Sequence, residues 1–265
     1  MNPETPERPG AGGGERWIAA ALAFVLLATW EIAVRAGFVR PMFFPPPTAI
    51  ARTFIEGFRS GLLLEHLAAT LARVFPGLVL GGAPGLLLGL MMGWSRRVRG
   101  VADPFVAAVH PVPKLALLPL FMVIFGIGEQ SKILVVAAAA FFPMLLNGMA
   151  GVRQISPVHF EVARNYGASR MQMLTRVVLP GSLPMVLTGL RLAANIAFLS
   201  AIAVEIAAAD TGLGALVWMS WEVLRVEQLY ATLFLTGLLG VALNATLQWL
   251  GRRTVPWLSE QEHFV

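Results

Sequence analysis

Four charged side chains lie within segments that are otherwise apolar: Arg73, Lys114, Arg191 and Glu205. In a membrane-spanning helix such a charge costs about 2.5 to 3.5 kcal/mol, so it needs a partner, water or a ligand. Asn195 lies one helical turn from Arg191, and these two side chains are expected to face the same way. The excess of cations favours a small anion as the ligand, an argument that pairing with Glu205 would remove.

Structural roles are the alternative to a place on a translocation pathway. Lys114 lies among three prolines in the segment HPVPKLALLPL, where it could pair with a neighbour or snorkel to the interface. Arg191 could snorkel to the cytoplasmic interface, and Glu205 could reach water at the outer end of its segment. The sequence leaves both sets of roles open.

Catalysis by this chain finds little support in the sequence. An enzyme embedded in a membrane would need a nucleophile with its base, or metal ligands at a usable spacing. The chain contains no cysteine, and its four histidines are widely separated. A P-loop would need lysine followed by serine or threonine, whereas Lys114 precedes leucine and Lys132 precedes isoleucine. We therefore expect no metal, no cofactor and no P-loop ATP site on this chain.

The composition is that of a membrane protein. Hydrophobic residues make up 57% of the chain and charged residues 13%, against about 25% charged residues in an ordinary soluble domain. The basic residues separate apolar segments instead of forming one basic face, so they indicate membrane topology and not nucleic-acid binding. Residues 1–16 are rich in proline, glycine and charge, which predicts a disordered cytoplasmic tail.

Six apolar segments are long enough to cross a bilayer. They span about 17–36, 67–94, 104–126, 131–151, 184–208 and 229–250. These segments predict an all-α integral membrane domain over residues 17–253. Arginines follow the second and fourth segments and flank both chain ends, so the positive-inside rule places both termini in the cytoplasm, N-in and C-in. Residues 254–265 would then be a second cytoplasmic tail. The first outer loop also holds four arginines, which weakens this asymmetry.

Three local patterns predict details of these segments. The loop segment PPPTAIARTFIEGF favours a short amphipathic helix on the outer membrane surface, capped by Thr48. Glycines at four-residue intervals in the second segment (Gly77, Gly81, Gly85, Gly89 and Gly93) favour close helix packing, with a pathway lining as the alternative. Asp103 and Pro104 would cap and begin the third span, whose prolines indicate broken backbone facing other helices.

A charged insert separates the fourth and fifth apolar segments. Ser156 and Pro157 predict a helix start, Gly167 a helix end, and Ser169 with Gln172 a capping box that opens a second helix. Each helix of about ten residues would be about 15 Å long, too short to cross a bilayer. Both are amphipathic, so they must cover either the inner ends of the spans or a soluble partner.

Within this insert, one stretch resembles the E-A-A, x3, G, x9, I-x-L-P loop of ABC importer permeases. The matching residues are Glu161-Val162-Ala163, Gly167, Val177 and Leu179-Pro180. All spacings are kept, whereas Val162 departs from the family alanine and Val177 from the isoleucine. The likeness extends from about residue 41 to residue 214 and is greatest to the nitrate, sulfonate, taurine and bicarbonate branch.

The resemblance implies a type I ABC importer permease with six spans and a cytoplasmic coupling loop over residues 152–183. The coupling residues it implies are Glu161, Val162, Ala163, Arg164, Gly167, Ala168, Leu179 and Pro180. It implies four partners: a cytoplasmic ATPase dimer that holds ATP and Mg, a second copy of this chain, a periplasmic or surface-tethered binding protein, and membrane lipid. The implied location is a bacterial inner membrane, and the implied solute a sulfonate, taurine, nitrate or bicarbonate.

A secondary transporter or channel for a small anion is the alternative. Such a protein would more often show paired broken helices in corresponding halves. It would have no need of a hinged cytoplasmic hairpin, and its uptake would follow an ion gradient.

Overall fold

The computed structural model describes residues 13–254, and every regular element within that range is helical. The predicted tails lie largely outside this range. Residues 13–16, which were assigned to the first tail, instead begin helix α1 (Gly13–Arg35). Within the described range, five helices are long and apolar enough to cross a membrane, or six if one bent pair counts as a span.

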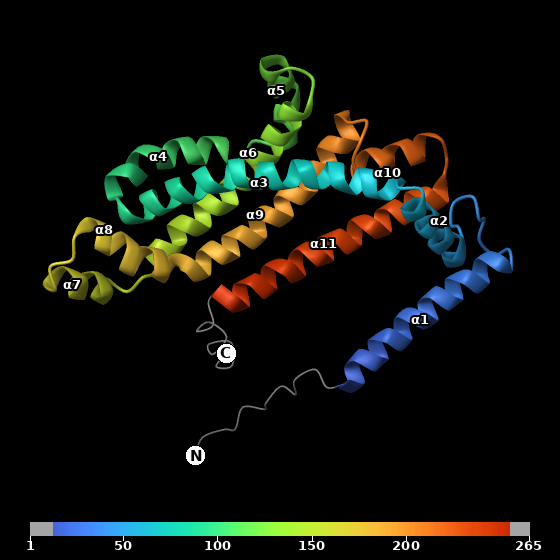
Figure 1. The fold of residues 1–265 in the computed structure, drawn as a ribbon, viewed down its shortest axis with the longest axis horizontal. Helices are drawn as coiled ribbons and strands as arrows, with labels where there is room; N and C mark the ends of the chain where they lie inside the picture. Colours follow the sequence, from blue (N-terminus) through green and yellow to red (C-terminus); the bar gives the residue numbers. More distant parts are fainter. Residues whose placement is uncertain (1–12, 255–265) are drawn as a thin grey trace.

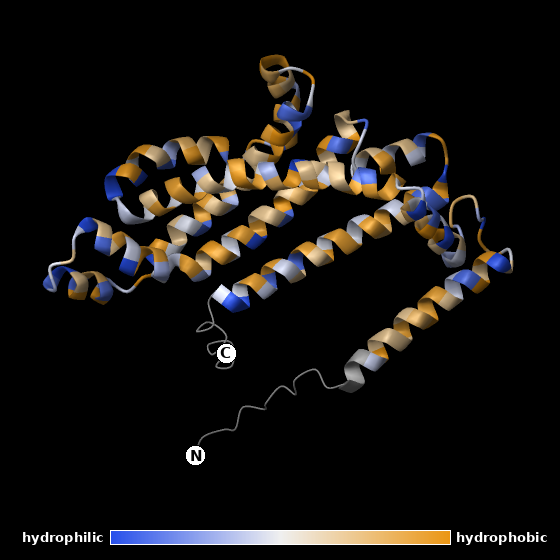
Figure 2. Cartoon of the chain, in the orientation of Figure 1, coloured by the Kyte–Doolittle hydropathy of each residue, from blue (hydrophilic) through white to orange (hydrophobic). Residues whose placement is uncertain are grey.

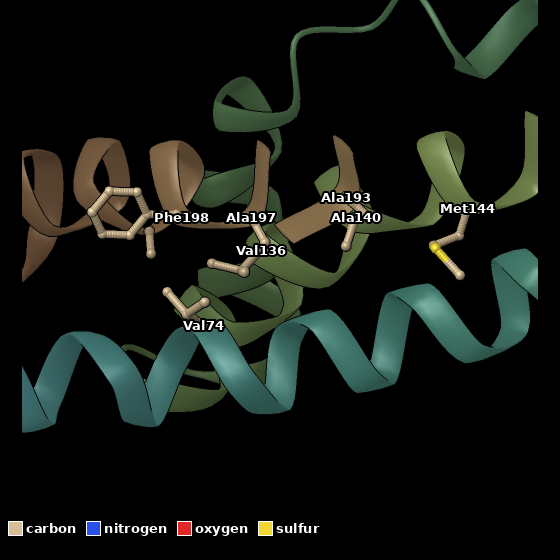
Figure 3. Packing of buried hydrophobic residues seen from close by; sticks show 8 residues of the cluster. Val74, Val136, Ala140, Met144, Ala193, Ala197 and Phe198 are labelled. Carbon is tan, nitrogen blue, oxygen red and sulfur yellow. The ribbon is translucent and has the colours of Figure 1, made fainter. Parts of the chain in front are cut away.

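Three long helices form the core: α3 (Leu62–Trp94), α6 (Glu129–Arg153) and α9 (Leu179–Ala208). In Figure 1, α3 and α6 run toward the end that holds the predicted cytoplasmic hairpin, and α9 runs away from it. Their contact is built from alanine and valine side chains together with one methionine and one phenylalanine, as Figure 3 shows. This cluster comprises Val74, Val136, Ala140, Met144, Ala193, Ala197, Phe198 and Ala201.

The glycine stripe of α3 packs against α6, as its spacing predicts. A side chain added at Gly81, Gly85 or Gly89 would collide with the backbone carbonyl of Ala137, Phe141 or Leu145. Because only a hydrogen fits at these positions, the two backbones approach closely. The stripe is therefore a packing surface between α3 and α6.

The predicted third span is broken into two helices. Helix α4 (Arg96–Val109) is followed by a 3-10 turn at Lys114–Leu117 and by α5 (Leu118–Phe125), and the pair is bent by 89°. The predicted start at Asp103 and Pro104 is wrong, because both lie inside α4. The helix begins eight residues earlier, where the Ser95 hydroxyl accepts a hydrogen bond from the Val98 amide.

Helices α2 (Pro47–Arg59), α10 (Leu213–Glu222) and α11 (Val226–Thr254) pack beside this core, whereas α1 stands apart from it in Figure 1. Helix α2 begins after Pro46, so the predicted cap at Thr48 is wrong. The Thr48 amide and hydroxyl instead donate to the Glu31 carboxylate of α1. Phe54 and Phe58 of α2 pack on a leucine cluster formed by α3, α10 and α11. Figure 2 shows apolar residues along the length of the long helices.

Candidate functional site

The charged insert folds as the predicted helix, hinge and helix. Helix α7 (Pro157–Asn165) is followed by Gly167 at φ +71°. The Gly167 amide donates to the Arg164 carbonyl and the Ala168 amide to the Ala163 carbonyl. This pair of bonds is a Schellman motif, which needs a left-handed residue after the helix and so explains the glycine.

The second helix of the insert starts at α8 (Arg170–Met173) with the predicted capping box between Ser169 and Gln172. It does not stop before the fifth span. A π-helical turn at Leu174–Val178 joins α8 directly to α9, so residues 170–208 form one continuous helix. The π turn precedes Pro180, which has no amide hydrogen and leaves the usual helical bond unmade.

The two halves of the insert bury different faces. Val178 is fully buried and joins Leu90 and Val152 at the end of α3 and α6, with Leu174 packed against them. By contrast, Val158 and Val162 of α7 and Tyr166 just after it are 60%, 47% and 88% exposed. These three residues recur at four-residue intervals and form one uncovered stripe. The second helix thus covers the inner ends of the spans, whereas the α7 stripe has no cover within residues 13–254.

The predicted coupling residues lie on the surface around this stripe. Glu161 and Arg164 are exposed, and neither forms an ion pair in the described part of the chain. Leu179 and Pro180 are also exposed, at the first turn of α9. Ala163 and Ala168 are half-buried. The hairpin therefore presents one carboxylate and one guanidinium beside an apolar stripe.

The opposite end of the bundle holds a polar cluster, which we call the outer network; Arg73 and Glu205 are buried in it, and Glu129 is exposed at its edge. Arg73 of α3 donates to Glu205 at 2.8 Å and to Glu129 at 2.6 and 2.9 Å. It also donates to the carbonyl and hydroxyl of Thr211. Glu205 is fully buried, so the alternative in which it reaches water is wrong. Its charge is matched by Arg73, and pairing therefore removes Arg73 as evidence for an anionic ligand.

The turn after α9 closes the outer network. The Glu205 carboxylate accepts bonds from the Thr70 hydroxyl and the Gly214 amide, each at 2.9 Å. The Thr70 hydroxyl also lies 2.8 Å from the Leu213 amide, and His66 Nδ1 lies 3.1 Å from the Gly212 amide. These contacts fix the segment TGLG against α3 and position the start of α10.

The other predicted pathway residues lie elsewhere. The Lys114 ammonium donates to the carbonyls of Val109, His110 and Val112 and lies 4.3 Å from the Phe142 ring centroid. It therefore stabilises the break after α4. Arg191 is half-buried on α9, one turn from Asn195, and its Nε atom is buried without a hydrogen-bond partner in the described residues.

These side chains do not meet at one site. Arg191 and Glu205 are fourteen residues apart on one helix, or about 21 Å at 1.5 Å per residue. Sequence reasoning missed Glu129, Thr70 and His66 in the outer network. His66, Thr70 and Arg73 recur at helical spacing in an apolar segment, and this polar stripe was a signal that could have found them. Helix α10 was also missed.

Comparison with known proteins gives one family match. Residues 85–260 match the model of the binding-protein-dependent transport system inner membrane component. The taurine transport system permease protein TauC of Escherichia coli (strain K12) is 37% identical over 241 residues, which cover 89% of this chain and 88% of that protein. The putative aliphatic sulfonates transport permease protein SsuC of Bacillus subtilis (strain 168) is 32% identical over 91% of this chain and 87% of its own.

Solved structures of the MetNI methionine ABC transporter in inward-facing conformations share the fold. One superposes with a TM-score of 0.65 over 75% of this chain and 96% of that chain, at 22% sequence identity. Another gives a TM-score of 0.61 over 71% of this chain and 92% of that chain, also at 22% identity.

Proposed function

The chain belongs to the binding-protein-dependent transport system inner membrane components, the permease subunits of ABC importers, and from that premise we propose that α7 couples it to a cytoplasmic ATPase. Membership confirms the family, the fold and the inner-membrane location that the sequence predicts. Import that depends on a binding protein follows from the family description. The coupling role, the identity of the solute and the pairing of two copies are our proposals.

The main observation that supports the coupling proposal is the uncovered apolar stripe on α7. Val158, Val162 and Tyr166 expose apolar surface to water, whereas Leu174 and Val178 of the neighbouring helix pack against α3 and α6. An exposed apolar stripe flanked by charges is typical of a helix that fits a groove in another protein. Since the chain has no P-loop, the ATP that drives import must bind that partner.

The continuous helix from α8 to α9 supplies a route for the movement. Val178 is fully buried against α3 and α6, and α9 begins at the next residue. A displacement of α8 therefore acts directly on α9, and α7 is joined to α8 through the short turn at residues 166–169. Gly167 confines the change of direction to one hinge at the end of α7.

A second copy of the chain is proposed to complete the pathway. Helix α5 projects from the bundle in Figure 1. Val123, Ile124 and Ile127, on and just after it, are exposed in the single chain. A symmetric dimer would cover this apolar surface with the same surface of its partner.

A small organic sulfonate is the proposed solute. This choice is based on the similarity to the taurine and aliphatic sulfonate permeases, whose chains align with nearly the whole of this one. Within the described spans, Arg191 keeps a buried nitrogen without an acceptor and is the candidate group to meet an anion. Arg73 does not have this role, because Arg73 and Lys132 together match the charges of Glu129 and Glu205.

Glu161→Lys tests the coupling role. We expect taurine uptake and co-purification of the ATPase to fall by roughly tenfold or more, since an unpaired interfacial charge costs about 2 to 5 kcal/mol. Membrane insertion should be unchanged, because the Glu161 side chain is exposed and forms no ion pair within residues 13–254. Glu65→Lys makes the same charge reversal at an exposed position on the opposite end of the bundle and is the control. Normal uptake and co-purification in Glu161→Lys would refute the coupling role, and uptake that survives ATP depletion would favour a secondary transporter.

A further inference from the structure

A cavity of about 650 Å³ lies between the α3–α4 junction and the hairpin. Its lining combines the last residue of α3, the first residues of α4 and side chains from α7 and α8. Four arginines line it: Arg96, Arg97, Arg164 and Arg170. Among the residues that the structure describes, the lining includes no carboxylate.

These four arginines lack counterions within the part of the chain that the structure describes. All four side chains are exposed, and none of them takes part in an ion pair. Like charges that converge on one cavity repel one another unless an anion lies between them. The first amides of a helix have no partner within the helix, and the N-terminus of the fourteen-residue α4 adds to the positive field. Guanidinium groups in this number suit the oxygens of a phosphate.

The cavity continues into apolar surface. Trp94, Phe160 and Met173 contribute apolar surface to its lining. From Arg97, an exposed stripe runs along α4 at four-residue intervals through Val101, Phe105 and Val109. No residue of α4 is buried, so this stripe has no cover from the rest of the described chain. A free phosphate would use the arginines alone, whereas an amphiphile would use both the arginines and the stripe.

We propose that this cavity binds the phosphate headgroup of an anionic phospholipid from the cytoplasmic leaflet, with an acyl chain along the α4 stripe. Basic pockets between helices on the cytoplasmic side of a membrane are suited to such headgroups. The bound lipid would connect the α3–α4 junction to the hairpin and would hold α7 relative to the spans. The proposal rests on the membrane location of the chain and on the cytoplasmic side of the hairpin, and is independent of the solute.

Lipid selectivity tests the site directly. The full-length chain, in nanodiscs of phosphatidylcholine, is titrated with spin-labelled phosphatidylglycerol or spin-labelled phosphatidylcholine. We expect the wild type to bind phosphatidylglycerol more tightly than phosphatidylcholine. In the Arg97→Gln, Arg170→Gln double variant, we expect the ratio of the two affinities to fall roughly tenfold. The control, Arg252→Gln with Arg253→Gln, removes the same charge from the end of α11, outside the cavity. An equal loss in the control would mean general surface attraction and would overturn the proposal.

Two further arms separate other occupants of the cavity. Inorganic phosphate at high concentration should not displace the labelled lipid, and displacement would identify a free-anion site instead. The measurement is repeated on the complex with its ATPase, where retention of the lipid is expected. Loss of the lipid on ATPase binding would make the cavity a protein docking site. If the double variant does not fold, Arg97→Lys with Arg170→Lys keeps the charge but not the planar donors, and unchanged selectivity there would contradict the proposed phosphate contacts.

Discussion

The two ends of this bundle differ in whether their charged side chains are paired within the chain or exposed on the surface. At the outer end, Arg73 and Glu205 are 2% and 0% exposed and satisfy each other, with Glu129 and the TGLG turn completing the outer network. At the hairpin end, Glu161 and Arg164 are exposed beside an uncovered apolar stripe. A charge that is fully satisfied within the chain holds the fold together, whereas a charged surface left open is available to another molecule. The outer end therefore stabilises the fold, and the hairpin end holds the open surface that carries our coupling proposal.

The largest effect is expected at the outer network. Arg73→Met would leave Glu205 buried without its cation, and breaking a buried pair in this way costs about 3 to 5 kcal/mol. We expect a lower unfolding temperature and a poorer folded yield in detergent. The double variant Arg73→Met, Glu205→Met removes both charges and should recover part of this loss. Arg52→Ala breaks an exposed pair with Glu56 and is the control, with an expected cost of about 0 to 1 kcal/mol. An Arg73→Met variant as stable as Arg52→Ala would end the distinction between the two ends.

A smaller effect on stability, with a larger one on transport, is expected at the hinge. Gly167 has φ +71°, and a side chain added there would meet nothing within 4 Å. Gly167→Val therefore introduces no collision, but a branched residue in the left-handed region costs about 1 to 2 kcal/mol. Since this cost falls on the hairpin, we expect normal membrane insertion and reduced taurine uptake. Gly100→Val, at an open helical position in α4, is the control for added bulk. Equal uptake in the two variants would remove the hinge from the mechanism.

The smallest effect on stability is expected at Arg191, which belongs to neither group. Its Nε atom is buried without an acceptor in residues 13–254, so its present environment gains little from the charge. Arg191→Gln should change the free energy of unfolding by less than about 1 kcal/mol and should weaken taurine uptake. Uptake kinetics and thermal unfolding of the same preparation separate the two effects. Unchanged kinetics would mean that Arg191 does not meet the solute.

Local signals in the sequence predicted the hairpin end well. The capping box at Ser169, the helix end at Gly167 and the close packing of the α3 glycines each depend on residues a few positions apart, and the structure confirms them. The predicted start of α4 was wrong because both Ser95 and Asp103 can cap a helix, and Ser95 is the residue that does so. The join of α8 to α9 was missed because a π turn accommodates Pro180, which reads as a break in a regular helix.

The outer network could not be predicted in the same way. Arg73 and Glu205 are 132 residues apart in the chain, and only the packing of α3 against α9 brings them together. A single sequence shows that each charge in a span costs free energy, but it does not identify the residue that pairs with that charge. The excess of cations therefore favoured an anionic ligand for Arg73, and the structure replaces that ligand with two carboxylates.

Cross-linking from α7 tests the central claim, that this helix contacts a separate ATPase, most directly. Because the chain has no cysteine, Val162→Cys creates a single reactive thiol on the exposed stripe, and Phe38→Cys creates a matched one on the exposed loop after α1. With a short bifunctional reagent in membranes, we predict that Val162→Cys joins the permease to its ATPase and that Phe38→Cys does not. If Val162→Cys is labelled from the outer face, or forms no ATPase adduct in a transport-competent complex, the account is contradicted.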